Sequence, residues 1–497
     1  MGELLYHPYP MAHVELREMA FQMRSEDLRA YGQKVLERDT ERRAAFEVLD
    51  LMAYLVACDF IGAEAKVETI QYKFKGTRDE AYVFAATTLA MGHVYFAYGR
   101  FDEMETSIAE FLNNGKVNQI EEGEFLDVLR LRAQKEMILD QFEKLEATYS
   151  EMLKYEVEDQ SENALFLINS VKAMVYMTQG EFIKAAEVAK KNIAISEQNN
   201  YTGLMAPLDS LYVLARCNLA GAKNKEALAI FDEVKILAEK FSQWPWYFMS
   251  DGYLSREFAI NNQITEALEI VRKEREKLAD LDFKHNLGFI PDVNELYCRH
   301  LIKDVERMET LLARVPDLIM VQQMRVLSHE WRGVNLKNFY DELPDRTPRE
   351  KIYKQVALAE LYVDKESIAV DHMFNALQIA EETGQVEFIL RQFRLFDIIL
   401  KAIARKPTVF LEYMATRIAE RIKQNEAKNV AGIPVPLTSR ELEIVKHLSI
   451  GKPISQIGGS LHVSMNTMKT HLRNIYRKLE VDGREKAVEK AKELFLI

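Results

Sequence analysis

Ser464-Met-Asn-Thr-Met-Lys-Thr-His-Leu-Arg-Asn-Ile-Tyr-Arg-Lys-Leu479 is the stretch around which the terminal part of this chain is organised. Its apolar residues recur at steps of four, three and four, which places them on one stripe of a helix: Met468, Leu472, Ile475 and Leu479. The opposite face carries Lys469, Arg473 and Arg477, and Ser464 stands ahead as an N-cap. A short helix with one packed face and one cationic face is what insertion into a major groove requires.

Three further short helices are expected around this segment. Thr438-Ser439-Arg440-Glu441 is a capping box that opens a helix through about Leu448, and Gly451 ends it. The inner face of that helix would be formed by Leu442, Ile444, Val445 and Leu448. A second helix would run from about Pro453 to Leu461, since proline is tolerated in a first turn. The last helix would pack through Ala487, Val488, Ala491, Leu494 and Phe495. Four helices in about sixty residues form a complete small domain with a helix-turn-helix at its centre.

Many residues of this segment, in order and without a gap, follow the pattern of a known family. They are Leu437-Thr438-x-Arg440-Glu441, Gly451, Ile457, Leu461, Val463-Ser464, Thr467-Met468-Lys469-Thr470-His471-Leu472, Asn474-Ile475-Tyr476-x-Lys478-Leu479, Val481, Arg484 and Ala487. In these residues the chain resembles the LuxR/GerE-type DNA-binding domain. The match covers about one eighth of the chain.

The resemblance implies roles for particular residues. Base contacts would come from Lys469, Thr470 and Arg473, and dimerisation from the final helix. Contacts with the DNA backbone are implied near Thr467 and Lys478. We add Ser464 and Arg477 as further candidates for backbone contacts.

The second helix departs from the family pattern. Where the family usually has a Ser-Asn-Lys-Glu-Ile-Ala run, this chain has Pro-Ile-Ser-Gln-Ile-Gly at residues 453–458, followed by Gly459. Two glycines inside a short helix cost roughly 1 kcal/mol each relative to alanine, so we expect a weakened supporting helix. The missing charged pair removes polar contacts beside the DNA backbone. The alternative is a degenerate module kept for dimerisation or protein contacts.

Charge separates the two ends of the chain. Of the 497 residues, 48% are apolar, enough for large cores, and the net charge is −12. Residues 437–497 hold 11 Lys and Arg against 7 Asp and Glu, a net charge of +4, and the remainder has a net charge of −16. An acidic body would repel DNA from everywhere except the basic end. Solubility accounts for the acidic body equally well.

Other classes of protein are not indicated. The three cysteines, Cys58, Cys217 and Cys298, lack metal-ligand spacing, and we expect reduced, mostly buried thiols in an intracellular protein. We see no signal peptide and no apolar run of membrane-spanning length, so we expect a soluble cytoplasmic protein. No phosphate-binding loop, nucleophile elbow or zinc motif occurs, so we expect no enzymatic activity, no cofactor and no metal. His462 and His471 have no ligand cluster beside them, and His471 matches the family motif.

From about Ala12 to Arg421 the sequence is helical in pattern and repeats every 40 to 42 residues. Gly92, Ala133, Ala173, Ala215 and Ser255 mark the repeat, and Met104, Leu145, Ala185, Ala227 and Ala267 follow each of them after twelve positions. Three residues of the second set are alanines, and small residues at such positions let two antiparallel helices approach closely, as in an array of helical hairpins. The unit Ala173, Tyr176, Gly180, Ala185 and Ala189 resembles a tetratricopeptide repeat (TPR). A later unit with Ala357, Ala369 and Ala376-Leu377 keeps the pattern.

The period fades between about Asp280 and Glu350. His285 to Pro291 and Trp331-Arg332-Gly333 suggest loops, with degenerate helices around Leu296 and Leu311. A period near 40 exceeds the usual 34 and is similar to the sensor region of regulators of the maltose-activator type, in which a helical array also precedes a LuxR-type domain. Residues 378–384 and 388–390 resemble the closing unit of that region.

These features predict an all-α fold: a TPR-like superhelix of helical hairpins at residues 1–422, a linker at 423–436 and a LuxR-type helix-turn-helix domain at 437–497. The linker is polar and then contains Gly432, Pro434 and Pro436, which favour an extended path. Trp244-Pro245-Trp246-Tyr247-Phe248 gathers four aromatic residues in what we expect to be a loop. Trp244, Trp246 and Tyr247 are candidates for a partner or ligand surface. Packing of these rings between hairpins is the alternative.

The main hypothesis is a bacterial transcriptional regulator. Its repeats would sense a small molecule or a protein, and its terminal domain would bind double-stranded DNA as a homodimer, with RNA polymerase as a further partner that such a regulator could contact. The runner-up is a protein-interaction adaptor or anti-regulator, in which the repeats capture a partner and the terminal domain only pairs subunits. The sequence does not specify the operator, the effector or the sign of regulation.

Overall fold

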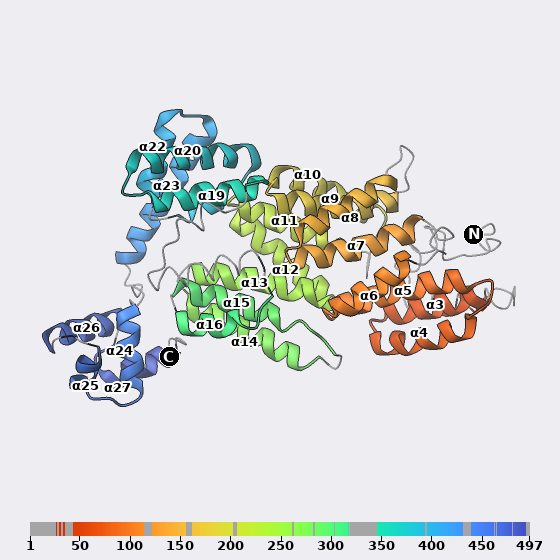
Figure 1. The fold of residues 1–497 in the computed structure, drawn as a ribbon, viewed down its shortest axis with the longest axis horizontal. Coiled ribbons are helices and arrows are strands. Elements are labelled where there is room, and N and C mark those ends of the chain that lie inside the picture. The colour runs from red at the N-terminus through yellow and green to blue at the C-terminus, as the bar shows by residue number, and fades with distance from the viewer. Residues whose placement is uncertain are drawn as a thin grey trace. The chain divides into compact units, whose positions relative to one another are not determined.

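The computed structural model describes a defined part of the 497 residues. Described are residues 26, 29–30, 33–34, 43–113, 122–155, 162–201, 206–260, 263–281, 284–302, 304–316, 318, 345–392, 395–430, 439–461, 463, 465–479 and 481–493. Every regular element in them is a helix, which confirms the predicted all-α class (Figure 1). The chain divides into two compact units, Met1–Asp251 with Asp280–Gly288 and Tyr340–Gln392, and Gly252–Ala279 with Phe289–Phe339 and Phe393–Ile497.

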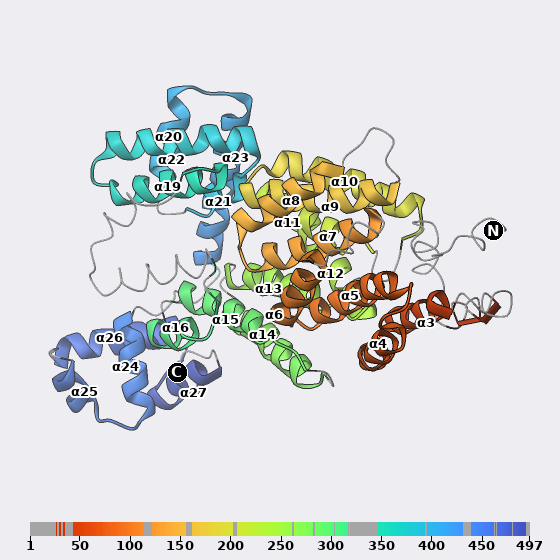
Figure 2. The ribbon, with the colours of Figure 1, turned by 45° about the vertical axis from the view of Figure 1, so that its right-hand side comes forward.

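Helical hairpins build the first unit, and consecutive helices run side by side in both ribbon views (Figures 1 and 2). The first helices of the hairpins are α3 (Arg43–Val56), α5 (Glu80–Ala97), α7 (Glu122–Ile138), α9 (Glu162–Gln179) and α11 (Leu208–Ala220). Their partners are α4 (Phe60–Phe74), α6 (Phe101–Asn113), α8 (Phe142–Met152, followed by the 3-10 turn Leu153–Tyr155), α10 (Phe182–Gln198) and α12 (Asn224–Lys240). Helix α13 (Trp244–Ile260) starts in this unit and ends in the second.

The small-residue period marks these hairpins as predicted. The five marker residues lie on α5, α7, α9, α11 and α13, and the five residues twelve positions later lie on α6, α8, α10, α12 and α14 (Ile264–Ala279). All ten are buried. At Gly92 a β-carbon would lie 2.9 Å from Leu131 Cδ1, so α5 and α7 approach closely at this position and a larger residue would displace the Leu131 side chain. Ser255 Oγ donates a hydrogen bond to Ala267 O at 2.9 Å, which joins the two marker positions of one hairpin.

The turn inside each hairpin also repeats. One residue per turn has a positive φ, at Cys58 (56°), Gly99 (65°), Asp140 (53°), Gly180 (87°) and Ala222 (60°), again 40 to 42 residues apart. Three of the five are not glycine, although the left-handed region favours glycine. The series begins with Cys58, so α3 and α4 form a repeat that the sequence period did not include.

Within the first unit, a later hairpin packs against the earlier ones. Helices α19 (Pro348–Leu361), α20 (Glu366–Thr383) and α21 (Val386–Leu390) lie against α9, α10 and α11. Thr347 and Glu350 form a capping box at the start of α19, and Arg346 pairs with Glu143 of α8 at 2.8 Å. Gly180 lies so close to this hairpin that a β-carbon would meet Arg349 N at 2.8 Å. The later unit predicted from Ala357 and Ala369 is therefore a hairpin, and it covers part of the earlier array.

In the second unit, one prediction from the sequence is wrong. Residues 289–291, which we expected in a loop, begin α15 (Phe289–Leu301), and α15 pairs with α16 (Val305–Leu312) in a hairpin. Pro291 lies in the first turn of α15. Amide groups in a first turn make no hydrogen bond within the helix, so proline is tolerated there. Trp331-Arg332-Gly333 lies outside the described residues.

Two helices precede the terminal domain, α22 (Phe396–Arg405) and the longer α23 (Val409–Val430). Helix α23 extends over residues 423–430 of the predicted linker. Residues 423–430 contain neither proline nor glycine and include good helix formers, which allows the helix to continue. Residues 431–436 lie outside the described part of the chain.

Candidate nucleic-acid interface

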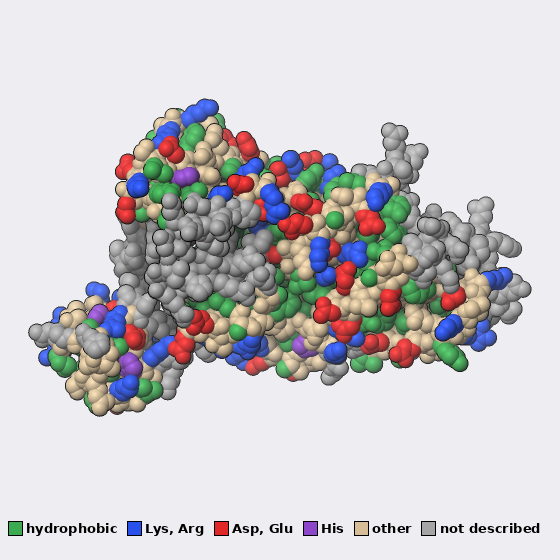
Figure 3. All heavy atoms as spheres, in the orientation of Figure 1, with side chains coloured by type: hydrophobic (Ala, Val, Ile, Leu, Met, Phe, Trp, Pro, Cys, Tyr) green, Lys and Arg blue, Asp and Glu red, His purple; other side chains and the backbone are tan. Residues whose placement is uncertain are grey.

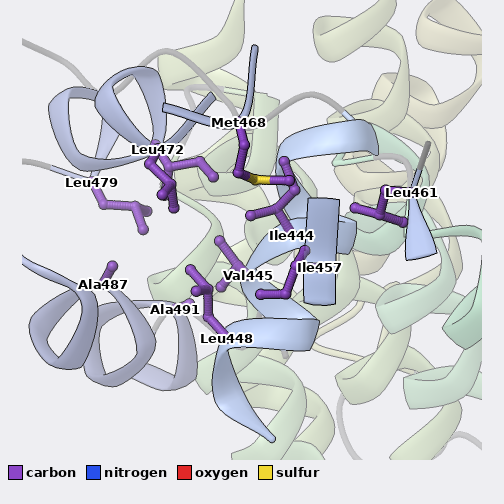
Figure 4. Close-up of a cluster of buried hydrophobic side chains, with 11 residues drawn as sticks. Ile444, Val445, Leu448, Ile457, Leu461, Met468, Leu472, Leu479, Ala487 and Ala491 are labelled. Atoms are coloured by element: carbon purple, nitrogen blue, oxygen red, sulfur yellow. The ribbon is translucent and has the colours of Figure 1, made fainter. Parts of the chain in front are cut away.

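The terminal domain has its own core (Figure 4). Its helices are α24 (Ser439–Ser449), α25 (Ile454–Ser460), α26 (Met465–Lys478) and α27 (Arg484–Glu493). The core consists of Ile444, Val445, Leu448, Ile457, Leu461, Met468, Leu472, Ile475, Leu479, Ala487 and Ala491. The apolar stripe predicted for the cationic helix is therefore confirmed. The side chain of Leu442 and the residues Leu494 and Phe495 fall outside what the structure describes.

Backbone carbonyl groups at the helix ends are bound by arginines. Gly451 has φ +80° and ends α24, as predicted. Arg484 Nη2 donates to Leu448 O at 2.9 Å and to Lys452 O at 3.0 Å, which fixes α27 beside the end of α24. Arg440 donates to Leu461 O at the end of α25. The bond from Arg440 holds the turn between α25 and α26 against α24.

The outer face of α26 is basic and exposed. Lys469, Arg473 and Arg477 follow one another at steps of four residues, and all three side chains are exposed. Within the described part of the chain, no ion pair engages any of these three cations. Thr467 and Thr470 are exposed on the same helix. Five of the predicted contact residues thus lie on the solvent side of one helix, opposite the buried stripe.

Lys478 lies elsewhere. Its Nζ pairs with Glu441 Oε2 at 2.6 Å, and the side chains are 10% and 3% exposed. The sequence analysis placed Lys478 with the backbone contacts and Glu441 in a capping box with Thr438. Glu441 receives the Lys478 ammonium. The predicted capping box involves Thr438, which lies outside the described residues. Ser464, the remaining candidate for a backbone contact, also lies outside them.

Helix α25 is short and carries no charged residue, as its sequence indicated. Gly458 is enclosed, because a β-carbon there would lie 3.3 Å from Val463 O across the turn into α26. Gly459 faces open space, because a β-carbon added there would meet no atom within 4 Å. Packing therefore explains why a glycine occupies position 458 but does not explain the glycine at position 459.

Two further ion pairs of the domain join residues close in the sequence. Arg440 lies 2.7 Å from Glu443, and Lys486 lies 2.9 Å from Asp482. The hydrogen bond from Lys486 holds the pKa of Asp482 below its usual value. On the face drawn in Figure 3, acidic and basic side chains are interspersed over the helices of residues 43–316. The uninterrupted basic row of α26 differs from this mixture.

The aromatic segment at residues 244–248 requires a second correction. Trp244 begins α13, so the segment is helical and not a loop. Trp246 is 1% exposed, with its ring centroid 5.3 Å from Tyr212 and 6.0 Å from Phe96. Trp244 is also buried and Tyr247 is half-buried. Pro245 can occupy a first helical turn, which the loop interpretation overlooked. The rings pack between hairpins, and the two indoles offer no exposed partner surface.

Sequence analysis missed a buried polar cluster on the first helices of four hairpins. Arg130 of α7 donates to Asp127 Oδ1 at 3.2 Å and to Asp209 Oδ2 of α11 at 3.1 Å. Asp209 also accepts from Gln134 at 2.8 Å and from Ser170 of α9. His93 of α5 lies 3.4 Å from Asp127. The residues of this cluster come from four helices that are distant in the sequence, so no local sequence pattern predicts it.

The described residues contain no group of three or more His, Cys, Asp and Glu side chains placed to hold a metal ion. No described helix is long and apolar enough to cross a membrane. The cysteines are free, and Cys217 and Cys298 are buried as expected, while Cys58 is half-buried.

Residues 435–491 match the family model of bacterial regulatory proteins of the luxR family. The match spans all four helices of the terminal domain up to Ala491 in α27. The resemblance inferred from the sequence is thus confirmed for this domain, which is a helix-turn-helix of the kind carried by DNA-binding transcription regulators. The match does not extend to the helical hairpins.

Proposed function

We propose that this chain is a transcription regulator in which residues 437–497 bind double-stranded DNA through α26 and residues 1–422 receive a small-molecule or protein signal. The observation that carries the proposal is the exposed basic row Lys469, Arg473 and Arg477, opposite a stripe that packs into the domain core. A helix held in this way presents a cationic surface to a groove without giving up its packing.

The side chains suit different parts of a duplex. Lys469 and Arg473 can donate to the O6 and N7 acceptors of guanine, and the Thr470 methyl group can contact thymine. Thr467 and Arg477 lie towards the two ends of α26, where groove-bound helices pass the phosphate backbone. Ser464 remains a candidate for a backbone contact just before the helix. We propose that two copies pair through the final helix on DNA and that the bound dimer contacts RNA polymerase.

The hairpins suit the sensing role. Stacked hairpins present an extended concave surface, which commonly holds a partner segment or ligand. Each hairpin touches mainly its neighbours, so a ligand can alter the curvature of the array by small changes at each interface. Residues 431–436 contain Gly432, Pro434 and Pro436, which would make a short connection between the two functions.

The test is recovery of genomic fragments with the purified full-length protein near physiological salt. The variant is Lys469→Ala/Arg473→Ala, and the matched control is Lys184→Ala/Lys191→Ala on α10, which removes the same charge from exposed positions of the repeats. We expect the wild type and the control to recover the same few fragments and the α26 variant to lose them.

Recovery of the same fragments by all three proteins would refute the assignment to α26. Recovery of none by the full chain calls for the fragment 431–497, which contains the whole core of the domain. Binding by the fragment alone would make the repeats an inhibitory sensor. Binding by neither would favour the adaptor, for which the uncharged α25 is the supporting feature.

A further inference from the structure

The four basic residues on α26 fall into two groups. Lys469, Arg473 and Arg477 are exposed, while Lys478 forms an almost buried ion pair with Glu441 at 2.6 Å. Consecutive helix positions differ by about 100° of rotation, so Lys478 leaves the face that the steps of four define. Lys478 lies three residues beyond Ile475 of the core stripe, which turns its side chain inward.

The ion pair joins two ends of the domain. Lys478 is the last residue of α26, and Glu441 lies in the first turn of α24. A carboxylate in a first turn is favourable towards the helix dipole, and so is a cation in a last turn. Between them, α24 and α26 already share the core residues Ile444, Met468 and Ile475. The pair therefore fixes the angle of the basic helix on its support.

We infer, on the basis of the proposed function, that Lys478 is a positioning residue and not a phosphate contact. To reach a phosphate, Lys478 would have to give up its ion pair with Glu441, and breaking a buried ion pair from one side is strongly unfavourable. The phosphate contacts made by the basic residues of α26 are then confined to Lys469, Arg473 and Arg477.

This division has a measurable consequence. The logarithm of the binding constant falls linearly with the logarithm of the salt concentration, and each phosphate that a cation neutralises makes this slope more negative by about 0.9. Removing the charge of Arg477 should reduce the magnitude of the slope by about 0.9. Removing the charge of Lys478 should leave the slope unchanged, because its counter-charge is Glu441 in both the free and the bound protein.

The experiment measures the affinity of the full-length protein for a duplex of about 30 base pairs and mixed sequence by fluorescence anisotropy, over a series of KCl concentrations. The main variant is Glu441→Gln/Lys478→Met, which removes both charges and leaves no buried carboxylate. The matched control is Arg477→Met, the same change of a neighbouring cation. We expect the wild-type slope in the double variant and a slope smaller by about 0.9 in the control. A double variant that loses as much slope as the control would overturn the inference.

A charge-reversal test applies if the variant Glu441→Gln/Lys478→Met does not fold. Lys478→Glu places two carboxylates together, and we expect it to weaken binding at least tenfold. Adding Glu441→Lys restores an opposite pair in reversed order and should return the affinity to within about threefold of the wild type. If Lys478 held a phosphate, the reversed pair would bind as poorly as Lys478→Glu.

The two proposals fail in different ways. If the wild type binds the duplex at no salt concentration, either as the full chain or as residues 431–497, the proposed function is refuted and this inference falls with it. If the wild type binds and the slope or the reversed pair behaves as a phosphate contact requires, only the assignment of Lys478 is wrong.

Discussion

Replacing Arg130 by methionine is expected to destabilise the first unit by about 3 to 5 kcal/mol, the usual cost of breaking a buried ion pair from one side. The Arg130 side chain is 3% exposed and bridges Asp127 and Asp209, at 3.2 and 3.1 Å. Methionine has a similar length and fills the space. The variant therefore isolates the loss of charge, which leaves two buried carboxylates without their shared cation.

The two aspartates keep other hydrogen-bond partners in this variant, so we expect a loss of stability near 3 kcal/mol, at the lower end of this range. Asp209 would keep the hydrogen bonds from Gln134 and Ser170, and Asp127 would keep His93. Arg132→Met is the matched control on the same helix. The Arg132 side chain is 16% exposed and its partner Glu105 is 39% exposed, so that pair should contribute less than about 1 kcal/mol.

The assay is urea unfolding followed by circular dichroism, with hydrogen exchange to locate the effect. Because hairpins in such an array interact mainly with their neighbours, loss of protection should concentrate in α7, α9 and α11. Adding Asp209→Asn to Arg130→Met should recover part of the stability, since it removes one of the two uncompensated charges. An Arg130 variant as stable as the Arg132 variant, or a double variant with no recovery, would refute the reasoning.

Three further substitutions concern Glu136 and two glycines of the terminal domain. Burial raises the pKa of Glu136 from 4.5 to about 7, so its charged form costs stability as the pH rises from 4.5 through 7. Glu136→Gln should therefore change the melting temperature little at pH 4 and increase stability by about 1 to 3 kcal/mol at pH 8; equal effects at both pH values would contradict this. Gly459→Ala should stabilise the terminal domain by about 1 kcal/mol, since the site is helical and open. Gly451→Ala should destabilise it by about 1 kcal/mol because φ is +80°. Chemical unfolding of residues 431–497 measures both, and equal signs would contradict the argument.

The hairpin array could be predicted because its steric requirement recurs. A small residue is needed wherever two helices cross closely, so Ala173 and Ala185 reappear as Ala215 and Ala227 one repeat later. The first hairpin, α3 and α4, was not predicted from this pattern because Leu51 occupies the position that Gly92 holds in the next repeat. Leu51 is nevertheless fully buried. Helix crossings tolerate different sizes when the partner residue compensates, and that compensation is invisible in a one-dimensional pattern.

In the terminal domain, the sequence predicted which residues face the core but not what each charge contacts. Helical spacing identifies the stripe from Met468 to Leu479, because the helical period determines which residues share a face and an apolar face packs into the core. The partner of Lys478 is 37 residues away in the sequence, and the choice between Glu441 and a phosphate depends on side-chain distance. For the same reason the Asp127, Arg130 and Asp209 cluster was missed. The error at Trp244 arose differently, since composition alone cannot distinguish a buried first turn from a loop.

The distribution of charge bears on how the proposed regulator would approach DNA. The net charge of +4 on residues 437–497 opposes −16 on the rest of the chain, so the long-range field of the whole protein is repulsive towards DNA. At physiological salt that field decays over about 8 Å, whereas contacts made by Lys469, Arg473 and Arg477 act at a few ångströms and are screened less. The acidic repeats would therefore select the orientation of approach and slow encounters from other directions. The affinity of the bound state would depend on the basic row of α26 and on the Glu441–Lys478 pair that holds this helix in place.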